Sequence, residues 1–108
     1  IDKYVYTDEA DMLNRLAFGQ TAREWRRQNP ALAKAGRNQR DYATEQQLVL
    51  IANLQSLNAF LIDQKMPQQE RIIKLAEHAR RHYDSILKAE EQHNIFMNDE
   101  IKRLNHEN

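Results

Sequence analysis

Residues 47–62, QLVLIANLQSLNAFLI, form the most apolar stretch of this 108-residue chain. On a helix, its leucines recur on one face, and other apolar side chains cover much of the remaining circumference. The leucines are Leu50, Leu54, Leu57 and Leu61, and the flanking residues are Leu48, Val49, Ile51, Phe60 and Ile62. A helix that is apolar on most sides must be enclosed by other elements, so the stretch predicts the central helix of a small domain. It is too short, and too interrupted by polar residues, to span a membrane.

Helix-ending residues divide the rest of the chain. Only two glycines and two prolines are present, which favours helices over a sheet fold. We therefore expect an all-α fold, roughly a four-helix bundle with a long C-terminal helix. The first expected helix covers about 8–17, is capped by Thr7 or Asp8 and is ended by Gly19. A second helix at 22–28 is capped by Thr21, and a loop with at most one helical turn follows at 31–41. The central helix begins with a Thr44–Gln47 capping box, and the last helix starts at Pro67.

The last helix carries an apolar seam that runs past the end of the domain. Ile72, Ala76, Ala79, Tyr83 and Ile86 follow the alternating four- and three-residue spacing of a buried helix face. An unbroken helix over residues 67–104 is about 57 Å long, more than a small domain needs. We therefore divide the chain into a helical domain, 1–87, and a helical tail, 88–108. The tail has five large apolar residues: Ile95, Phe96, Met97, Ile101 and Leu104. They either fold back on the domain or mediate self-association, and we favour self-association.

Charge is balanced over the chain but not over residues 23–40. The formal net charge is zero, whereas this segment has six basic residues and one acid, Glu24. Arginines there can bind phosphates while an aromatic ring supports a guanidinium or a base. The candidate anion- or nucleic-acid-binding residues are Arg23, Trp25, Arg26, Arg27, Arg37 and Arg40. In the alternative reading, Trp25 anchors a short helix to the core and the arginines lie in solvent or pair with nearby acids.

The sequence contains no pattern typical of a catalytic or metal site. It has no cysteine, glycine-rich phosphate loop or nucleophile–base arrangement, so we expect no enzyme activity and no cofactor. His78 and His82, one helical turn apart, either face solvent or supply two ligands of a metal, and solvent is the expectation. Asn53 and Asn58 lie on the otherwise apolar central helix and need polar partners where they are buried. We expect them to bind loop backbone or each other's neighbours, with a ligand role as the alternative. The lack of cysteine and of an apolar leader fits a cytoplasmic protein, and a start at Ile1 suggests a fragment.

Five blocks of sequence resemble one family in order and spacing. The blocks are EADMLN (9–14), FGQTAREWRRQNP (18–30), RDYA (40–43), QLVLIANLQSLN (47–58) and ERIIKL (70–75). They are similar to the C-terminal region of bacterial and phage proteins that carry a KilA-N domain at the N-terminus. The resemblance covers residues 6–87. The loop before RDYA is longer than the family pattern, and residues 88–108 lie beyond it.

The resemblance implies a DNA-associated protein of phage or mobile-element origin. In that family DNA is bound by the KilA-N domain, which is not among these residues. It implies for the C-terminal region an accessory role in assembly or partner binding, and we expect a homo-oligomer without a membrane partner. The alternative is direct nucleic-acid binding through residues 23–40.

Overall fold

A computed structural model describes Tyr6 and residues 8–107, with the side chain of residue 107 excluded. Thr7, a possible cap, and most of the N-terminal lead-in therefore lie outside the described residues. The all-α prediction with a long C-terminal helix is confirmed, and the described residues contain no strand. The elements are α1 (Glu9–Phe18), α2 (Ala22–Gln28), α3 (Pro30–Lys34), a 3-10 turn η1 (Gln39–Tyr42), α4 (Glu45–Asp63) and α5 (Gln68–Glu107).

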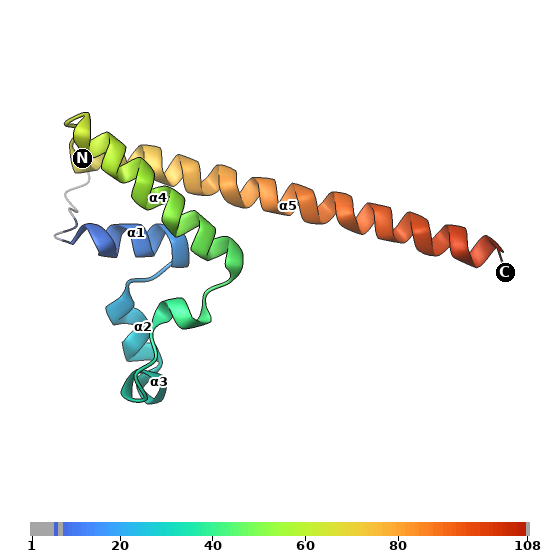
Figure 1. Ribbon diagram of the computed structural model, residues 1–108, viewed down its shortest axis with the longest axis horizontal. Helices are drawn as coiled ribbons and strands as arrows, with labels where there is room; N and C mark the ends of the chain where they lie inside the picture. The colour runs from blue at the N-terminus through green and yellow to red at the C-terminus, as the bar shows by residue number, and fades with distance from the viewer. Residues whose placement is uncertain (1–5, 7, 108) are drawn as a thin grey trace.

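Helices α1, α4 and the first half of α5 form the hydrophobic core (Figure 1). Their buried apolar residues make one cluster, in which α4 supplies the largest share. The members are Met12, Leu13 and Ala17 from α1, Leu50, Ile51, Leu54 and Leu61 from α4, and Leu75 and Ala79 from α5. The leucine face of the apolar stretch therefore points into the core, with Leu57 partly buried at its edge.

The expectation that other elements enclose α4 is wrong. Leu48, Val49, Phe60 and Ile62 are between 41% and 58% exposed, although they belong to the most apolar stretch of the chain. The reason is that α1 and α5 both pack on the leucine side of α4. Helix α2 packs mainly with α3 and η1, so none of the described elements covers the outer side of α4.

Local capping chemistry sets most helix boundaries. Asp8 Oδ1 accepts a hydrogen bond from the backbone N–H of Ala10 at 2.8 Å, and Gly19 ends α1 with φ of 81°. Thr44 and Gln47 form the expected capping box at the start of α4. The segment expected as a loop is more ordered than predicted, because Pro30 starts α3 and an Asn38–Asp41 capping box starts η1.

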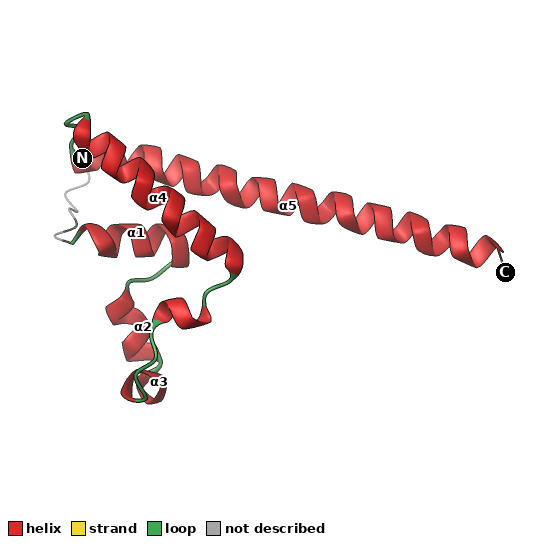
Figure 2. Cartoon of the chain, viewed as in Figure 1, coloured by secondary structure: helices red, strands yellow, loops and turns green. Residues whose placement is uncertain are grey.

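The segment from α2 to η1 forms a small lobe beside the core, which we call the α2–η1 lobe (residues 22–42). The rings of Trp25 and Tyr42 stack with centroids 5.9 Å apart and an interplanar angle of 25°. The side-chain amide of Gln39 is buried and donates a hydrogen bond to the Gln20 carbonyl at 3.1 Å. Figure 2 shows the lobe as short helices joined by loops, away from the long helices.

Helix α5 continues without a break for 40 residues and leaves the domain (Figure 1). Its buried face is centred on Arg71, Leu75 and Ala79. Ala79 belongs to the predicted seam and is buried as expected, whereas Arg71 and Leu75 lie one position away from the predicted Ile72 and Ala76, and Ile72 and Tyr83 pack at the edge of the core. Residues 87–106 are exposed except for the half-buried Glu100. The tail thus projects instead of folding back on its own core.

Candidate functional site

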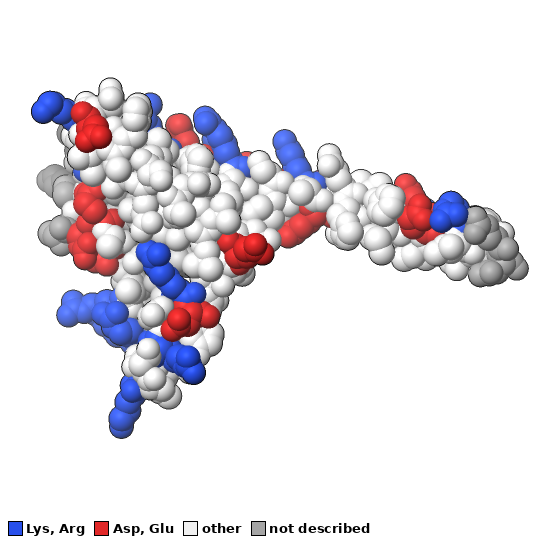
Figure 3. All heavy atoms as spheres, viewed as in Figure 1, with Lys and Arg blue, Asp and Glu red and all other residues white. Residues whose placement is uncertain are grey.

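The α2–η1 lobe gathers the basic residues of segment 23–40 on its surface. Figure 3 shows Lys and Arg side chains concentrated over this lobe. The lobe's arginines and lysine are all exposed: Arg23, Arg26, Arg27, Lys34, Arg37 and Arg40. None of them forms an ion pair within the part of the chain that the structure describes. Their positive charge is therefore available to an anionic partner.

The acids nearest in sequence are engaged elsewhere. Glu24 Oε1 lies 2.9 Å from Nη2 of Arg15 on α1 and accepts a hydrogen bond from the backbone N–H of Thr21. That backbone hydrogen bond is the main cause that lowers the pKa of Glu24 below its usual value. Asp41 Oδ2 accepts a hydrogen bond from the Asn38 N–H at 2.8 Å. Among the described residues, neither carboxylate lies within ion-pair distance of an arginine of the lobe, although the charge of Arg27 contributes to the lowered pKa of Glu24.

Trp25 holds the lobe together from inside. Only 6% of its surface is exposed, whereas its stacking partner Tyr42 is 54% exposed. Its ring also lines a small depression with Phe18, Gln39 and Ala43. The structure therefore places the five candidate arginines at the surface and Trp25 beneath them, so the exposed aromatic ring of the lobe is that of Tyr42.

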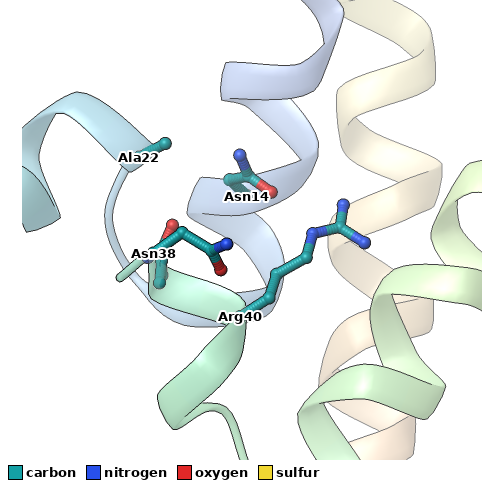
Figure 4. Close-up of a pocket in the computed structure, with 5 residues that line it drawn as sticks. Asn14, Ala22, Asn38 and Arg40 are labelled. Carbon is teal, nitrogen blue, oxygen red and sulfur yellow. The ribbon is translucent and has the colours of Figure 1, made fainter. Parts of the chain in front are cut away.

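A polar depression lies where the lobe meets α1. Figure 4 shows Asn14 on α1, Ala22 on α2, and Asn38 and Arg40 at η1 around one opening, which Gln39 also lines. Two side-chain amides and a guanidinium can together hydrogen-bond a phosphate or a polar group. Three of the five sequence blocks contribute to this depression through Asn14, Ala22 and Arg40.

A buried polar network joins the three core helices. Arg71 on α5 is buried, and its Nη1 donates hydrogen bonds to Glu9 Oε1 on α1 at 2.5 Å and to Asn58 Oδ1 on α4 at 2.7 Å. The amide of Asn58 donates to the same Glu9 oxygen at 2.9 Å, and Gln68 Nε2 donates to Glu9 Oε2 at 2.7 Å. Arg71 Nε donates to the Met66 carbonyl at 3.0 Å, which ties the network to the α4–α5 turn.

The network lowers the pKa of its carboxyl group, that of Glu9. The hydrogen bond from Arg71, opposed by desolvation and helped by Asn58 and Gln68, lowers the pKa of Glu9 to about 2. Its hydrogen-bonding atoms are satisfied by one another, which is the arrangement that lets a buried charge persist in a core. The network is therefore structural, and it offers no free group for a ligand.

Sequence reasoning missed this network. The expectation that Asn53 and Asn58 are held by loop backbone or by each other's neighbours is wrong. The side chain of Asn58 meets those of Glu9 and Arg71, and Asn53 is exposed. The available signal was the spacing of Arg71, Leu75 and Ala79, which places an arginine in line with a buried face. Glu9, Asn58 and Arg71 come from three different blocks of the family resemblance.

His78 and His82 do not converge on a common site. His82 Nε2 lies 3.1 Å from the Gln46 carbonyl oxygen, whereas His78 Nε2 is buried and has no hydrogen-bond partner. Among the described residues, no group of three or more His, Asp or Glu side chains is placed to share a metal ion. In the same residues no helix combines the length and apolarity needed to cross a membrane.

The apolar tail residues do not all share one face. Because successive residues of a helix turn by about 100°, Met97, Ile101 and Leu104 line one side of α5. Phe96 lies at the margin of that side and Ile95 points nearly opposite. All five are exposed, at 43% or more of their surface. We call Met97, Ile101 and Leu104 the tail face.

Comparison of the chain with protein-family models, with curated proteins and with solved structures finds no match. The two candidate binding surfaces are the tail face and the basic α2–η1 lobe.

Proposed function

We propose that this chain is the non-catalytic C-terminal accessory module of a KilA-N-type DNA-associated protein and that it holds two copies together through α5. The observation that supports self-association is the projecting second half of α5, which exposes Met97, Ile101 and Leu104 to solvent on one face. Soluble chains rarely keep a continuous apolar stripe in water, and helix-on-helix pairing is the usual way to bury one.

The energetics of such a pairing are adequate. Burying one large apolar side chain contributes about 1.5–3 kcal/mol. Two copies that pair through the tail face each bury three such residues, and the sum is comparable with the roughly 4–15 kcal/mol that association costs. A closed two-fold dimer is the commonest arrangement for identical chains.

Substitution of the tail face tests this function in the full chain. We expect the triple variant Met97→Gln, Ile101→Gln, Leu104→Gln to be a folded monomer by light scattering at tens of micromolar, roughly the range in which a modest interface is populated. Ile95→Gln is the matched control, because it removes an equally exposed apolar residue from the opposite side. A wild-type chain that is already monomeric under these conditions contradicts the proposal.

The family assignment has its own test. The sequence encoded directly upstream of Ile1 is expected to contain a KilA-N domain. A different domain there contradicts the assignment but leaves the self-association proposal intact.

Direct nucleic-acid binding is the second candidate, and the exposed basic residues of the α2–η1 lobe favour it. Phosphate contacts by Arg and Lys release counterions, so such binding weakens steeply with salt. The depression between Asn14 and Arg40 lies at the edge of the same lobe and suits a phosphate. The arginines carry this candidate, because Trp25 is buried.

Fluorescence anisotropy with labelled duplex and single-stranded DNA tests the second candidate. We expect Arg26→Gln, Arg27→Gln, Arg37→Gln, Arg40→Gln to abolish affinity at low salt. The matched control removes four basic charges from α5, at Lys74, Arg80, Arg81 and Lys88, all of which are exposed. Equal loss in both variants indicates a non-specific charge effect, and no affinity of the wild-type chain at low salt rejects this candidate.

A further inference from the structure

A heptad pattern follows α5 along almost its entire length. Residues spaced alternately by three and four positions from residue 73 to 104 occupy one slowly turning stripe of the helix. We call these residues the α5 stripe: Ile73, Ala76, Arg80, Tyr83, Leu87, Glu90, Asn94, Met97, Ile101 and Leu104. The tail face is the C-terminal part of the α5 stripe.

Most of the α5 stripe stays accessible beside the folded domain. Tyr83 is the exception, because it packs against the core and its hydroxyl donates a hydrogen bond to the Ala17 carbonyl on α1 at 2.8 Å. Ile73 and Leu87 are each 61% exposed, although Leu75 and Ala79 on the neighbouring face are buried in the core. Ile73 and Ala76, with Ile72, Glu77 and Arg80, line a shallow apolar depression on the surface of α5. A second helix can therefore lie along the exposed positions of the stripe while Tyr83 keeps its contact with α1.

The direction of a second α5 follows from the polar residues of the stripe. In a parallel pair each residue faces its own copy, so Arg80 meets Arg80 and Glu90 meets Glu90 between the helices, where like charges are costly. In an antiparallel pair centred between residues 88 and 89, Arg80 faces Met97 and Glu90 faces Leu87. The arginine can then lay its alkyl stem on the methionine and keep its charge in water.

The same antiparallel register pairs apolar residues with each other at both ends of the stripe. Ile73 faces Leu104 of the second copy, and the small Ala76 faces its Ile101, so the tail of each copy covers the depression on the other. The remaining layer joins Tyr83 to Asn94. Each copy contributes five large exposed apolar side chains, which brings the buried surface to the order of the roughly 1,000 Å² that a specific interface needs.

We infer that two copies of this chain pair antiparallel along α5, so that the tail of each docks on the Ile73–Ala76 surface of the other. This inference rests on the proposed self-association and adds its geometry. It places the two domains at opposite ends of the helix pair, with the starts of the two α5 helices roughly 60 Å apart.

Disulfide trapping tests whether the two α5 helices pair antiparallel. The chain has no natural cysteine, so only the introduced cysteines can form a disulfide. A disulfide forms only where two Cα atoms come within about 7 Å. We expect Leu104→Cys alone and Ile73→Cys alone to give no cross-linked dimer in a glutathione redox buffer. A mixture of the two variants, one carrying a tag that changes its size, is expected to give the mixed dimer. Ile95→Cys mixed with Ile73→Cys is the control for random collision.

A charge reversal gives an independent readout. In the antiparallel register Asp84 flanks Glu91 of the second copy, twice per dimer, whereas in a parallel pair neither residue faces a charge. Glu91→Lys is therefore expected to tighten dimerisation about tenfold, because it replaces two repulsive pairs by attractive ones. Asp99→Lys, on the outer side of α5, is the matched control.

The outcomes separate this inference from the function on which it rests. A monomeric wild-type chain overturns both. A dimer in which Leu104→Cys cross-links to itself, or in which the mixed variants do not cross-link, overturns only the antiparallel register. Mixed cross-linking together with a tighter Glu91→Lys dimer supports it.

Discussion

Arg71 on α5 and Glu9 on α1 form an ion pair across 62 residues of chain, with Nη1 of the arginine 2.5 Å from Oε1 of the glutamate. The arginine side chain is 10% exposed and the glutamate side chain 42%. The pair thus reaches from the interior to the surface, and Asn58 completes it from α4. One buried charge therefore fixes how all three core helices meet.

The Arg71–Glu9 pair makes the free energy of unfolding depend on pH in the acid range. The pKa of Glu9 is lowered to about 2 in the folded chain, so the unfolded chain takes up the proton first as the pH falls. The stabilisation is complete above pH of about 4.5 and is lost as the pH falls towards 2. Because the Glu9 side chain is 42% exposed, solvent screens the pair, and we expect a loss of only about 1 kcal/mol over this range.

Urea unfolding at several pH values between 7 and 2 checks the effect. Glu9→Gln is expected to be less stable than the wild type at pH 7, because Arg71 keeps its charge in the core without a counter-charge. The difference between the two chains should shrink as the pH falls. Asp99→Asn, an exposed change in the tail, is the control and should follow the wild-type curve. A constant difference at every pH contradicts the role of the carboxylate.

The core face of α4 predicts a second, larger effect. Leu54 is fully buried between α1 and α5, and its neighbour Gln55 is exposed. Leu54→Asp places a carboxylate where it has no partner, which costs several kcal/mol and should unfold the domain. Gln55→Asp introduces the same residue at the next position of the same helix and should cost less than about 1 kcal/mol. Thermal melts followed by circular dichroism compare them, and similar melts would contradict the burial of Leu54.

The sequence predicts this fold best where the chemistry is local. Gly19 and the Thr44–Gln47 box mark helix ends because a positive φ and a side-chain cap need only adjacent residues. Arg71 and Leu75 were missed because the seam was placed one position away, at Ile72 and Ala76, and an arginine was not expected in a core. Pairing of Arg71 with Glu9 depends on tertiary contact over 62 residues, which no local pattern encodes.

The sequence predicts which residue types the candidate surfaces contain, but not how their side chains are arranged in space. Basic residues of segment 23–40 do share one lobe, yet Trp25 faces inward because Tyr42 stacks on it. The direction of the tail depends on whether the core has a free apolar surface to receive it. The open side of α4 shows that such a surface exists, and the unbroken backbone hydrogen bonding of α5 keeps the tail away from it.

We predict that substitution of Gly19 lowers the stability of the fold through backbone strain and not through packing. Its φ of 81° is strained for residues with a side chain, and a Cβ there would meet no atom within 4 Å. Gly19→Ala should therefore lower the free energy of unfolding by about 1 kcal/mol through strain alone. Gly19→Asn should lose less, because asparagine tolerates this region. Urea titration of both variants checks the order, and an equal loss would point to a packing cause instead.

We predict that the chain unfolds in two steps, with the α2–η1 lobe opening before the core. Trp25 is the one buried residue of α2, it stacks on the half-exposed ring of Tyr42, and α3 has no buried residue. The core cluster of α1, α4 and α5 does not include Trp25. A segment with so few buried apolar contacts opens at a lower free energy than the core. Because Trp25 is the only tryptophan, its fluorescence reports on the lobe, whereas far-UV circular dichroism is dominated by α4 and α5.

We therefore expect the fluorescence midpoint in urea to lie below the circular dichroism midpoint. Amide hydrogen exchange supplies the residue-level measurement: the amides of α2 should exchange by local opening, and those of the buried turns of α4 only by global unfolding. Tyr42→Ala removes the stacking partner and should move the fluorescence transition further down while leaving the circular dichroism midpoint almost unchanged. Coincident transitions in the wild type, or an equal shift of both in Tyr42→Ala, would instead make the lobe and the core one cooperative unit.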